Sequence, residues 1–362
     1  MIITSFALSA GKPPVDSNQA NEVSPAAEMP SEVHTAFTFE QLLERSTRTL
    51  NRNVENMLKC QPNIIKVANE LSNGNPALEL IAEFEEQVQA KRIRAQMFAQ
   101  EFGKSGAVMK HCREALPMEQ RQVLDVAQRN LLLDLRAKHS PPPEIIEAFD
   151  STIRSSDDFF DKLLELIDLI KNGYLAGYEH IIAAYSEFFS DFNAEITAMM
   201  KDWIEGAGDG KEVKLNAGMI RLALQALIQK YSHPNPAAVL FPAPGMAGAS
   251  QEEAEKWLKA LGLPASCLKQ NADGTYCVVM DLSPLTIMMD ALPPNVYWIT
   301  WDTARFQAWQ TGFNAQEERM KNMLQTFTQK YSNANSYHDN FNKTLSSHLN
   351  QYADMLKAML NF

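Results

Sequence analysis

The sequence lacks the features that mark a disulfide-stabilised or zinc-binding domain. Its 362 residues include only four cysteines, Cys60, Cys112, Cys267 and Cys277, and no two of them form a CxxC pair. Neither a zinc site nor a disulfide framework is therefore indicated. One bridge, from Cys267 to Cys277 across a predicted hairpin, stays open at this level.

Long apolar runs and catalytic motifs are also absent. No run approaches the roughly 20 apolar residues that a membrane span needs. The first ten residues resemble a signal-peptide core, but they lack a basic region and are interrupted by Thr4 and Ser5. The patterns GxxxxGK[ST], GxGxxG, HExxH and GxSxG do not occur, and the seven histidines are scattered. We therefore expect no catalytic residue, no metal site, no cofactor and no enzymatic activity.

Basic residues are few. Lys and Arg number 33 against 44 Asp and Glu, which gives a net charge of -11. Nucleic-acid binding needs a basic surface, so this balance argues against it. The longest basic cluster, Lys91-Arg92-Ile93-Arg94, is interpreted as a solvated helix face. Hydrophobic residues make up 45%, which is enough for a large core in two or three domains.

The first part of the chain is predicted to be a leader followed by a helical domain. Residues 1–37 are rich in Ser, Pro, Ala, Asn and Glu and are expected to be disordered. Thr38-Phe39-Glu40-Gln41 is a capping box that starts a helix, and Pro62 should end or kink it. A turn at 72–76, helices at about 78–101 and 117–138, and Pro141-Pro142-Pro143 complete a helical hairpin domain, residues 38–153.

Two stretches carry apolar residues at alternating spacings of three and four, which predicts coiled-coil arms over residues 154–205 and 302–362. Ser155-Ser156-Asp157-Asp158 is a capping signal for the first arm, whose phase shifts after Phe188 as in a stutter. The predicted seam of the first arm is Phe160, Leu163, Ile167, Ile170, Tyr174, Ile181 and Phe188. That of the second arm is Phe306, Trp309, Phe313, Met320, Met323 and Phe327.

A single helix cannot bury such a seam, so each arm needs a partner. We expect the arms to pair with each other as a central antiparallel coiled coil; two long helices in an ordinary bundle are the alternative. Residues 206–301 between them predict a small inserted α/β domain, with strands near 238–241, 267–269 and 276–280 and helices at 216–231 and 250–261. The expected fold class is mainly α.

Several segments carry a resemblance to a known family. They are Gly177–Phe189 (GYEHIIAAYSEFF), Val239–Ala243, Ala254–Leu258, Leu263–Lys269 and the long run Phe306–Ser336. On these residues the chain resembles the hydrophilic needle-tip proteins of type III secretion systems, the family of IpaD, SipD and BipD, and looks closest to the SipD branch. Residues 75–140 match poorly. Asn295–Trp301 is more aromatic than the family pattern, which indicates an extra strand or an apolar contact patch.

The resemblance implies a secreted virulence protein on the bacterial surface that caps the needle. It would control effector secretion during host-cell invasion and act as a platform for the translocator pore. The implied partners are the needle subunit, a hydrophobic translocator, further copies of the chain in a ring usually described as pentameric, and bile salts in enteric members. The hairpin would be a self-chaperone, and the leader would carry the export signal. Rival hypotheses are a cytoplasmic coiled-coil scaffold or regulator and a pore-forming translocator.

The needle contact is expected in the second arm. Residues 329–337 are dense in Asn and Gln, so this stretch is either a solvated helix or a recognition surface. We expect the segment after Lys330 to be exposed, near the end of the rod and far from the inserted domain. On the strength of the resemblance, the predicted needle-binding residues are Lys330, Asn333, Asn335, Ser336, Asp339, Asn340, Met359, Leu360 and Phe362.

Overall fold

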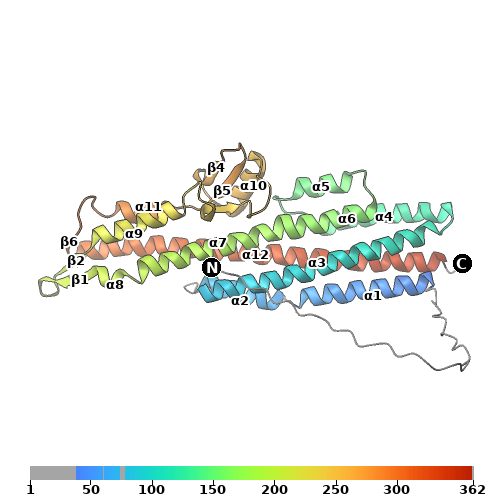
Figure 1. Cartoon of the computed structure of the whole chain (residues 1–362), viewed down its shortest axis with the longest axis horizontal. Helices are drawn as coiled ribbons and strands as arrows, with labels where there is room; N and C mark the ends of the chain where they lie inside the picture. The colour runs from blue at the N-terminus through green and yellow to red at the C-terminus, as the bar shows by residue number, and fades with distance from the viewer. Residues whose placement is uncertain (1–37, 60, 74–77, 361–362) are drawn as a thin grey trace, which may run out of the picture. The chain divides into compact units, whose positions relative to one another are not determined.

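Helices dominate the computed structural model, which describes residues 38–59, 61–73 and 78–360 (Figure 1). Ahead of the first strand lie α1 (Phe39–Leu58), α2 (Gln61–Asn73), α3 (Leu78–Glu114), α4 (Met118–Lys138), α5 (Ile146–Arg154), α6 (Phe159–Asp168), α7 (Ala176–Phe192) and α8 (Met200–Trp203). Later in the chain come α9 (Ala217–Lys230), α10 (Gln251–Leu261), α11 (Ser283–Asp290) and α12 (Thr303–Leu360). The mainly helical class is confirmed. The predicted leader, and most of the predicted turn at 72–76, lie outside the described residues.

Local signals set the start of α1. The Thr38 hydroxyl accepts a hydrogen bond from the Gln41 backbone N–H at 3.3 Å, and the Thr38 N–H donates to Gln41 Oε1 at 3.2 Å. This is the predicted capping box, which satisfies two backbone donors that a helix start leaves free. Pro62 lies in the first turn of α2, where its missing N–H costs no helical hydrogen bond. As predicted, the first helix does not continue through Pro62: α1 ends at Leu58.

Helix α3 is longer than predicted and continues past residue 101 to Glu114. Gly103 and Gly106 lower the helix propensity of this region. The small residues Ser105 and Gly106, however, allow neighbouring helices to pack closely against α3. A Cβ on Gly106 would lie 2.9 Å from the Phe160 ring, so only glycine lets α6 approach this closely. Ser105 Oγ also lies 2.7 Å from Ser46 Oγ of α1. Packing on both sides thus keeps the helix continuous.

The first arm is a helix with two π-helical segments, Leu169–Leu175 between α6 and α7, and Asn193–Thr197 after α7. Asp158 caps α6 by accepting from the Phe160 N–H at 3.0 Å, as the capping signal predicts. A π turn inserts one residue and moves the apolar face by that residue. The predicted shift of phase lies between Phe188 and Phe189, ahead of the second segment, and both residues are buried within the regular helix α7. The predicted seam residues of this arm are all buried: Phe160, Leu163, Ile167, Ile170, Tyr174, Ile181 and Phe188.

Helix α12 runs for 58 residues and pairs antiparallel with the first arm. Ring contacts show the direction, because residue numbers rise on one arm as they fall on the other. These contacts are Phe159–Tyr352, Tyr174–Tyr337, Tyr185–Phe327 and Phe192–Phe313, with centroids 5.1–6.2 Å apart. On α12, Trp309, Phe313, Met320 and Phe327 are buried, while Phe306 and Met323 are half-buried.

Two small antiparallel sheets lie between the arms in sequence. The first has the order β1-β2-β6 and comprises β1 (Ile204–Ala207), β2 (Glu212–Leu215) and β6 (Ile299–Asp302). The second has the order β3-β5-β4 and comprises β3 (Val239–Phe241), β4 (Leu268–Gln270) and β5 (Tyr276–Val279). The predicted strands form the second sheet. The β1–β2 hairpin was not predicted, and β6 is the extra strand suggested for 295–301.

The described cysteines, Cys112, Cys267 and Cys277, are all buried free thiols. Cys277 pairs in register with Lys269, so Cys267 is displaced along the β4–β5 ladder from the position opposite it. A disulfide needs closely opposed Cβ atoms. The possible Cys267–Cys277 bridge is therefore not formed.

The N-terminal helices lie along the paired arms (Figure 1). Helices α1 and α2 contact both α3 and α12, α3 contacts α6 and α7, and α4 contacts α12. The described residues from Thr38 onward belong to one compact unit with a continuous hydrophobic core. One side of α12 is thereby covered by the helices that the sequence assigns to the hairpin, and this cover positions the candidate site.

Candidate functional site

The predicted contact residues of α12 lie on two different faces. Asn333 and Asn340 are exposed, and their separation of seven residues places them on one side of the helix. Lys330 and Ser336 are half-buried beside them. Asn335, by contrast, is fully buried. The set is therefore divided into an accessible part and a covered part.

Asn335 and Asp339 lie beneath α3, so the prediction that they are exposed is wrong. Their relative exposures are 0% and 2%. Lys91 of α3 extends between them: its Nζ donates to Asn335 Oδ1 and lies 2.7 Å from Asp339 Oδ1. Lys91 is itself only 1% exposed, so the interpretation of 91–94 as a solvated face is wrong for this residue. We call Lys91, Asn335 and Asp339 the Lys91 site.

A histidine and an asparagine extend the Lys91 site along α12. His338 Nδ1 lies 2.9 Å from Asp339 Oδ1, and the Asn342 amide donates to the His338 carbonyl at 2.9 Å. Burial lowers the pKa of His338 below its ordinary value, against the opposing effect of Asp339. The imidazole is therefore neutral near pH 7. Lys91 is then the cation that balances the buried Asp339 carboxylate.

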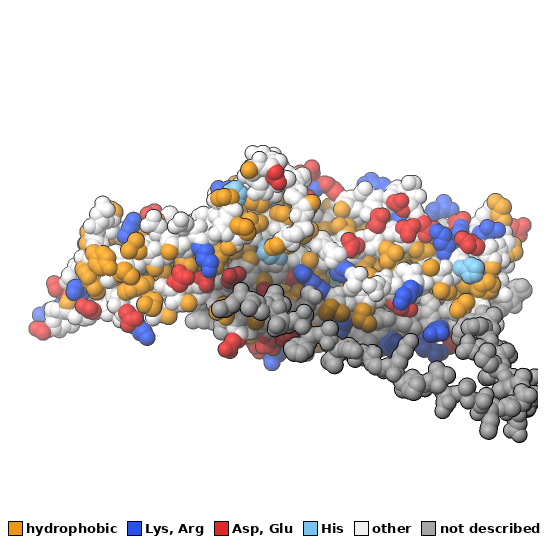
Figure 2. All heavy atoms as spheres, in the orientation of Figure 1, with side chains coloured by type: hydrophobic (Ala, Val, Ile, Leu, Met, Phe, Trp, Pro, Cys, Tyr) orange, Lys and Arg blue, Asp and Glu red, His pale blue; other side chains and the backbone are white. Residues whose placement is uncertain are grey.

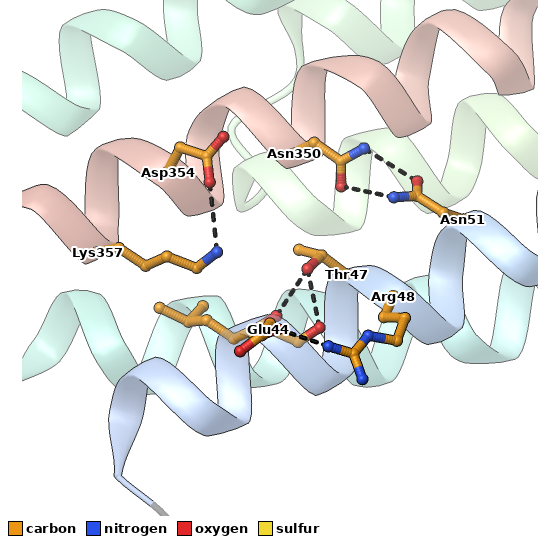
Figure 3. Close-up of polar contacts among 8 residues, drawn as sticks. Glu44, Thr47, Arg48, Asn51, Asn350, Asp354 and Lys357 are labelled. Atoms are coloured by element: carbon orange, nitrogen blue, oxygen red, sulfur yellow. Dashed lines mark hydrogen bonds and ion pairs between the residues drawn. The ribbon is translucent and has the colours of Figure 1, made fainter.

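Helix α1 covers the next part of α12 through one amide pair. Asn51 and Asn350 exchange hydrogen bonds of 3.0 and 3.3 Å, and the Ser346 hydroxyl donates to Asn51 Oδ1 at 2.8 Å. Figure 3 shows the two asparagines pointing toward each other from facing helices. Neutral hydrogen bonds of this kind contribute about 1 kcal/mol each. They align the two helices without locking charges between them.

Two ion pairs near this contact each lie within a single helix. Arg48 and Glu44 pair on α1, and Lys357 and Asp354 pair on α12 (Figure 3). Such exposed pairs contribute only about 0–1 kcal/mol and do not depend on the facing helix. Separating α1 from α12 would thus leave both ion pairs intact.

Helix α4 contacts the other side of the same segment. Gln128 donates to the Tyr352 hydroxyl at 2.9 Å, and His348 Nε2 lies 3.1 Å from Asp134 Oδ2. Between α4 and α12 is an open cleft of about 590 Å³, and Asn340 is one of its lining residues. The exposed face predicted for contact therefore borders a cavity rather than a flat surface.

Two further predictions concern the C-terminal residues and the distance between the contact segment and the inserted domain. Met359 and Leu360 are half-buried against the core, while Phe362 lies outside the described residues. Tyr337 packs on Tyr174, and Tyr174 also contacts Trp257 of α10, at 5.9 and 6.4 Å between ring centroids. The prediction that this segment lies far from the inserted domain is wrong, because the β3-β5-β4 sheet and α10 pack at mid-length along the arms rather than beyond their end.

A second ion pair, between a buried carboxyl group and a partly exposed arginine, joins α3 to α7. Arg92 lies 2.7 Å from Glu179 Oε2, and the Glu179 side chain is 3% exposed. Burial raises the pKa of Glu179 to about 7, against the lowering effects of Arg92 and Lys91. The contact between the hairpin and the first arm therefore contains a carboxyl group that titrates near neutrality.

We expect the stability of this contact to fall as the pH rises from about 5 to 7.5. The folded chain keeps the Glu179 proton above the ordinary glutamate pKa, so ionisation on raising the pH costs stability there. In Glu179→Gln this cost is absent. Urea unfolding should therefore show the variant gaining roughly 1–3 kcal/mol on wild type between pH 5 and 7.5. An equal difference between the two proteins at both pH values would contradict the assignment.

Within residues 38–59, 61–73 and 78–360 there is no group of His, Cys, Asp and Glu side chains placed to hold a metal ion. In the same part of the chain, no helix is both long and apolar enough to cross a membrane.

A family profile described as type III secretion systems tip complex components matches residues 7–360. The chain belongs to this family. The match includes residues 75–140, which on sequence motifs alone agree poorly with the family. It favours the tip-component interpretation over a cytoplasmic scaffold or a pore-forming translocator.

Curated relatives agree with the family assignment. The chain is 40% identical over 214 residues to the cell invasion protein SipD of Salmonella typhi, covering 58% of this chain and 62% of that protein. It is 37% identical over 249 residues to the invasin IpaD of Shigella flexneri, covering 67% and 72%. The alignments to SipD thus span less than two thirds of the relatives' length.

A solved structure supports the fold. The pathogenicity island 1 effector protein of Chromobacterium violaceum is 29% identical, with a TM-score of 0.58, and the match covers 87% of this chain and 97% of that one. The arrangement of paired arms, N-terminal helices and intervening sheets is therefore shared across most of both chains.

Proposed function

We propose that this tip complex component caps the needle of a type III secretion system through the C-terminal half of α12. The observation that carries the proposal is the division of that segment into two faces. One face, with Asn333 and Asn340, is open to a partner, and the other is covered by the chain's own N-terminal helices. The role is structural, with secretion controlled by occupancy of the needle end rather than by catalysis.

The N-terminal helices act as a self-chaperone in this proposal. They cover α12 with neutral hydrogen bonds from α1, and the nearby ion pairs are satisfied within each helix. Where α1 covers α12, contacts of this kind shield apolar surface before assembly and can be displaced at modest electrostatic cost. The leader, residues 1–37, would carry the signal for export to the bacterial surface.

The opposite end of the arms is the proposed platform for the hydrophobic translocator. Figure 2 shows hydrophobic side chains gathered over β6 and α9, at the left of the view. Exposed apolar residues in this region are Leu222, Ile287, Val296, Tyr297 and Trp298. Exposed patches of this type are typical of protein interaction sites. Ring assembly from several copies of the chain and a response to bile salts complete the proposal.

The decisive test replaces Asn333 and Asn340 together with alanine. Both are exposed, so stability should change by about 0.5 kcal/mol or less, while decoration of purified needles is lost and secretion becomes unregulated. Electron microscopy of needle ends and assays of culture supernatants measure the two effects. Asn314 and Asn322, exposed on the other half of α12, provide a matched double-alanine control that should decorate needles normally. Normal decoration by the Asn333/Asn340 variant would reject this contact.

A further inference from the structure

Lys91 occupies a position in α3 where the pattern calls for an apolar residue. The buried face of this helix runs through Ile81, Phe84, Val88, Lys91, Ala95, Phe98 and Phe102 at spacings of three and four. A buried ion pair is often no more stabilising than well-packed apolar residues of similar volume. Stability alone therefore does not explain a lysine here. The polar side chains that Lys91 meets on α12, Asn335 and Asp339, account for it instead.

The facing stretch of α12 is more polar than its burial warrants. Thr328 Oγ1, Tyr331 OH, Asn335 Nδ2, Asp339 Oδ2 and Asn342 Oδ1 have no hydrogen-bond partner among the described residues, and each of the five side chains is at most 3% exposed. Unsatisfied buried polar atoms destabilise the contact that buries them. Helix α3 therefore satisfies this surface only in part: Phe84 packs edge-to-face on Tyr331 at 5.5 Å, and Lys91 reaches two of the polar side chains.

We propose that the Lys91 site is the centre of a docking surface for a helix of the needle subunit, and that this helix places a lysine or arginine where Lys91 lies now. The inference rests on the proposed function and names the chemistry of its partner. Tyr331, Asn335, Asp339 and Asn342 recur at spacings of three and four and form a stripe along which one helix packs. The buried Asp339 carboxylate requires a cation from whichever helix covers it.

Exchange of one helix for the other is reversible for a physical reason. When α3 leaves, hydration of the Lys91 ammonium and the Asp339 carboxylate offsets the lost ion pair, and the incoming helix replaces the apolar burial that Phe84 and Val88 of α3 provide. The incoming cation then restores the pair. Lys91 thus acts as an internal competitor for the partner's cation.

Two full-length variants distinguish the packing of α3 on α12 from the binding of the needle subunit. Lys91→Gln and Asp339→Asn each leave one buried charge unpaired, so both should raise amide hydrogen exchange in residues 328–342 by at least about tenfold. Of the two variants, only Lys91→Gln keeps the Asp339 carboxylate, to which the cation of the needle subunit would bind. It should therefore bind purified needles of the same secretion system more tightly than wild type, whereas Asp339→Asn should bind more weakly than Lys91→Gln by about tenfold or more.

Three further variants guard the interpretation. Lys91→Gln/Asp339→Asn carries a neutral amide pair; it should fold, and it should bind needles as weakly as Asp339→Asn. Lys104→Gln removes an exposed cation from α3, and Asp354→Asn removes an exposed carboxylate from α12. Both controls should match wild type in hydrogen exchange and needle binding.

Each contrary result has a distinct meaning. Unchanged amide hydrogen exchange in Lys91→Gln would overturn the role of Lys91 in holding α3 on α12. Equal needle binding by Lys91→Gln and Asp339→Asn would overturn the requirement for a cation while leaving the proposed function in place. Absence of needle binding by wild type and every variant, with exchange rising as expected, would overturn the proposed function and the needle subunit as partner.

Discussion

Replacing Ile181 with aspartate is expected to lower the free energy of unfolding by about 4 kcal/mol or more, enough to unfold much of the chain. Ile181 is 0% exposed and lies in α7 within the seam that faces α12. The substitution leaves a cavity and places a carboxylate among the buried apolar side chains of the core. Circular dichroism during urea or thermal unfolding measures the loss directly.

Ile287 provides a matched control for this substitution. It is 46% exposed on α11, so Ile287→Asp should change stability by about 0.5 kcal/mol or less. Ile167→Asp, at a second buried seam position with 2% exposure, should behave like Ile181→Asp. If all three variants unfold at the wild-type midpoint, burial of the seam between the arms does not hold the fold together.

The arms were predictable from sequence because their signals are local and periodic. Alternating spacings of three and four from Phe160 to Phe188 bury one side of a helix whatever the details of its partner. The capping residues Thr38 and Asp158 act on backbone groups within three positions of themselves. Such features require no knowledge of the rest of the fold. The same reasoning found the β4–β5 hairpin through its turn.

The composition of the candidate site depends on contacts between distant residues and was only partly predictable. Asn335 and Asp339 look like solvated asparagine and aspartate on α12, and their burial follows from Lys91, 244 and 248 positions away in sequence. A signal for Lys91 did exist, since it continues the apolar spacing from Phe84 and Val88. Its charge favoured the solvated interpretation instead. Nothing in the local sequence distinguishes the exposed Asn333 and Asn340 from the buried Asn335.

The covered face therefore contains two kinds of contact with different consequences. Helix α1 meets α12 through the Asn51–Asn350 amide pair, which is neutral and replaceable by water. Helix α3 meets the arms through the buried Lys91–Asp339 pair and through Arg92–Glu179, in which Glu179 is buried and Arg92 is 45% exposed. Loss of one partner from the buried Lys91–Asp339 pair is costly, whereas release of the whole helix hydrates both charges but also exposes the apolar face of α3, including Phe84 and Phe98.

Replacing Trp257 with alanine is expected to cost about 3–5 kcal/mol and to loosen the second sheet from the arms. Trp257 of α10 is 2% exposed, stacks on Phe241 of β3 at 4.6 Å and contacts Tyr178 of α7 at 5.1 Å. Its ring thus joins the inserted sheet to the first arm. The measurement is chemical unfolding together with limited proteolysis between residues 232 and 282, which should accelerate in the variant.

Gly177 tests the same contact from the other side. A Cβ on Gly177 would lie 2.6 Å from Cη2 of Trp257, whereas one on Gly173 would meet only Leu169 Cδ1 at 3.5 Å. Gly177→Ala should therefore cost about 1–3 kcal/mol through overpacking, and Gly173→Ala should stay within about 1 kcal/mol of wild type. In the Trp257→Ala background the penalty of Gly177→Ala should vanish, because the two sites couple only through the ring. If the penalty persists there, the α7–α10 contact does not depend on Trp257, and the sheet must be held by its other contacts with α7.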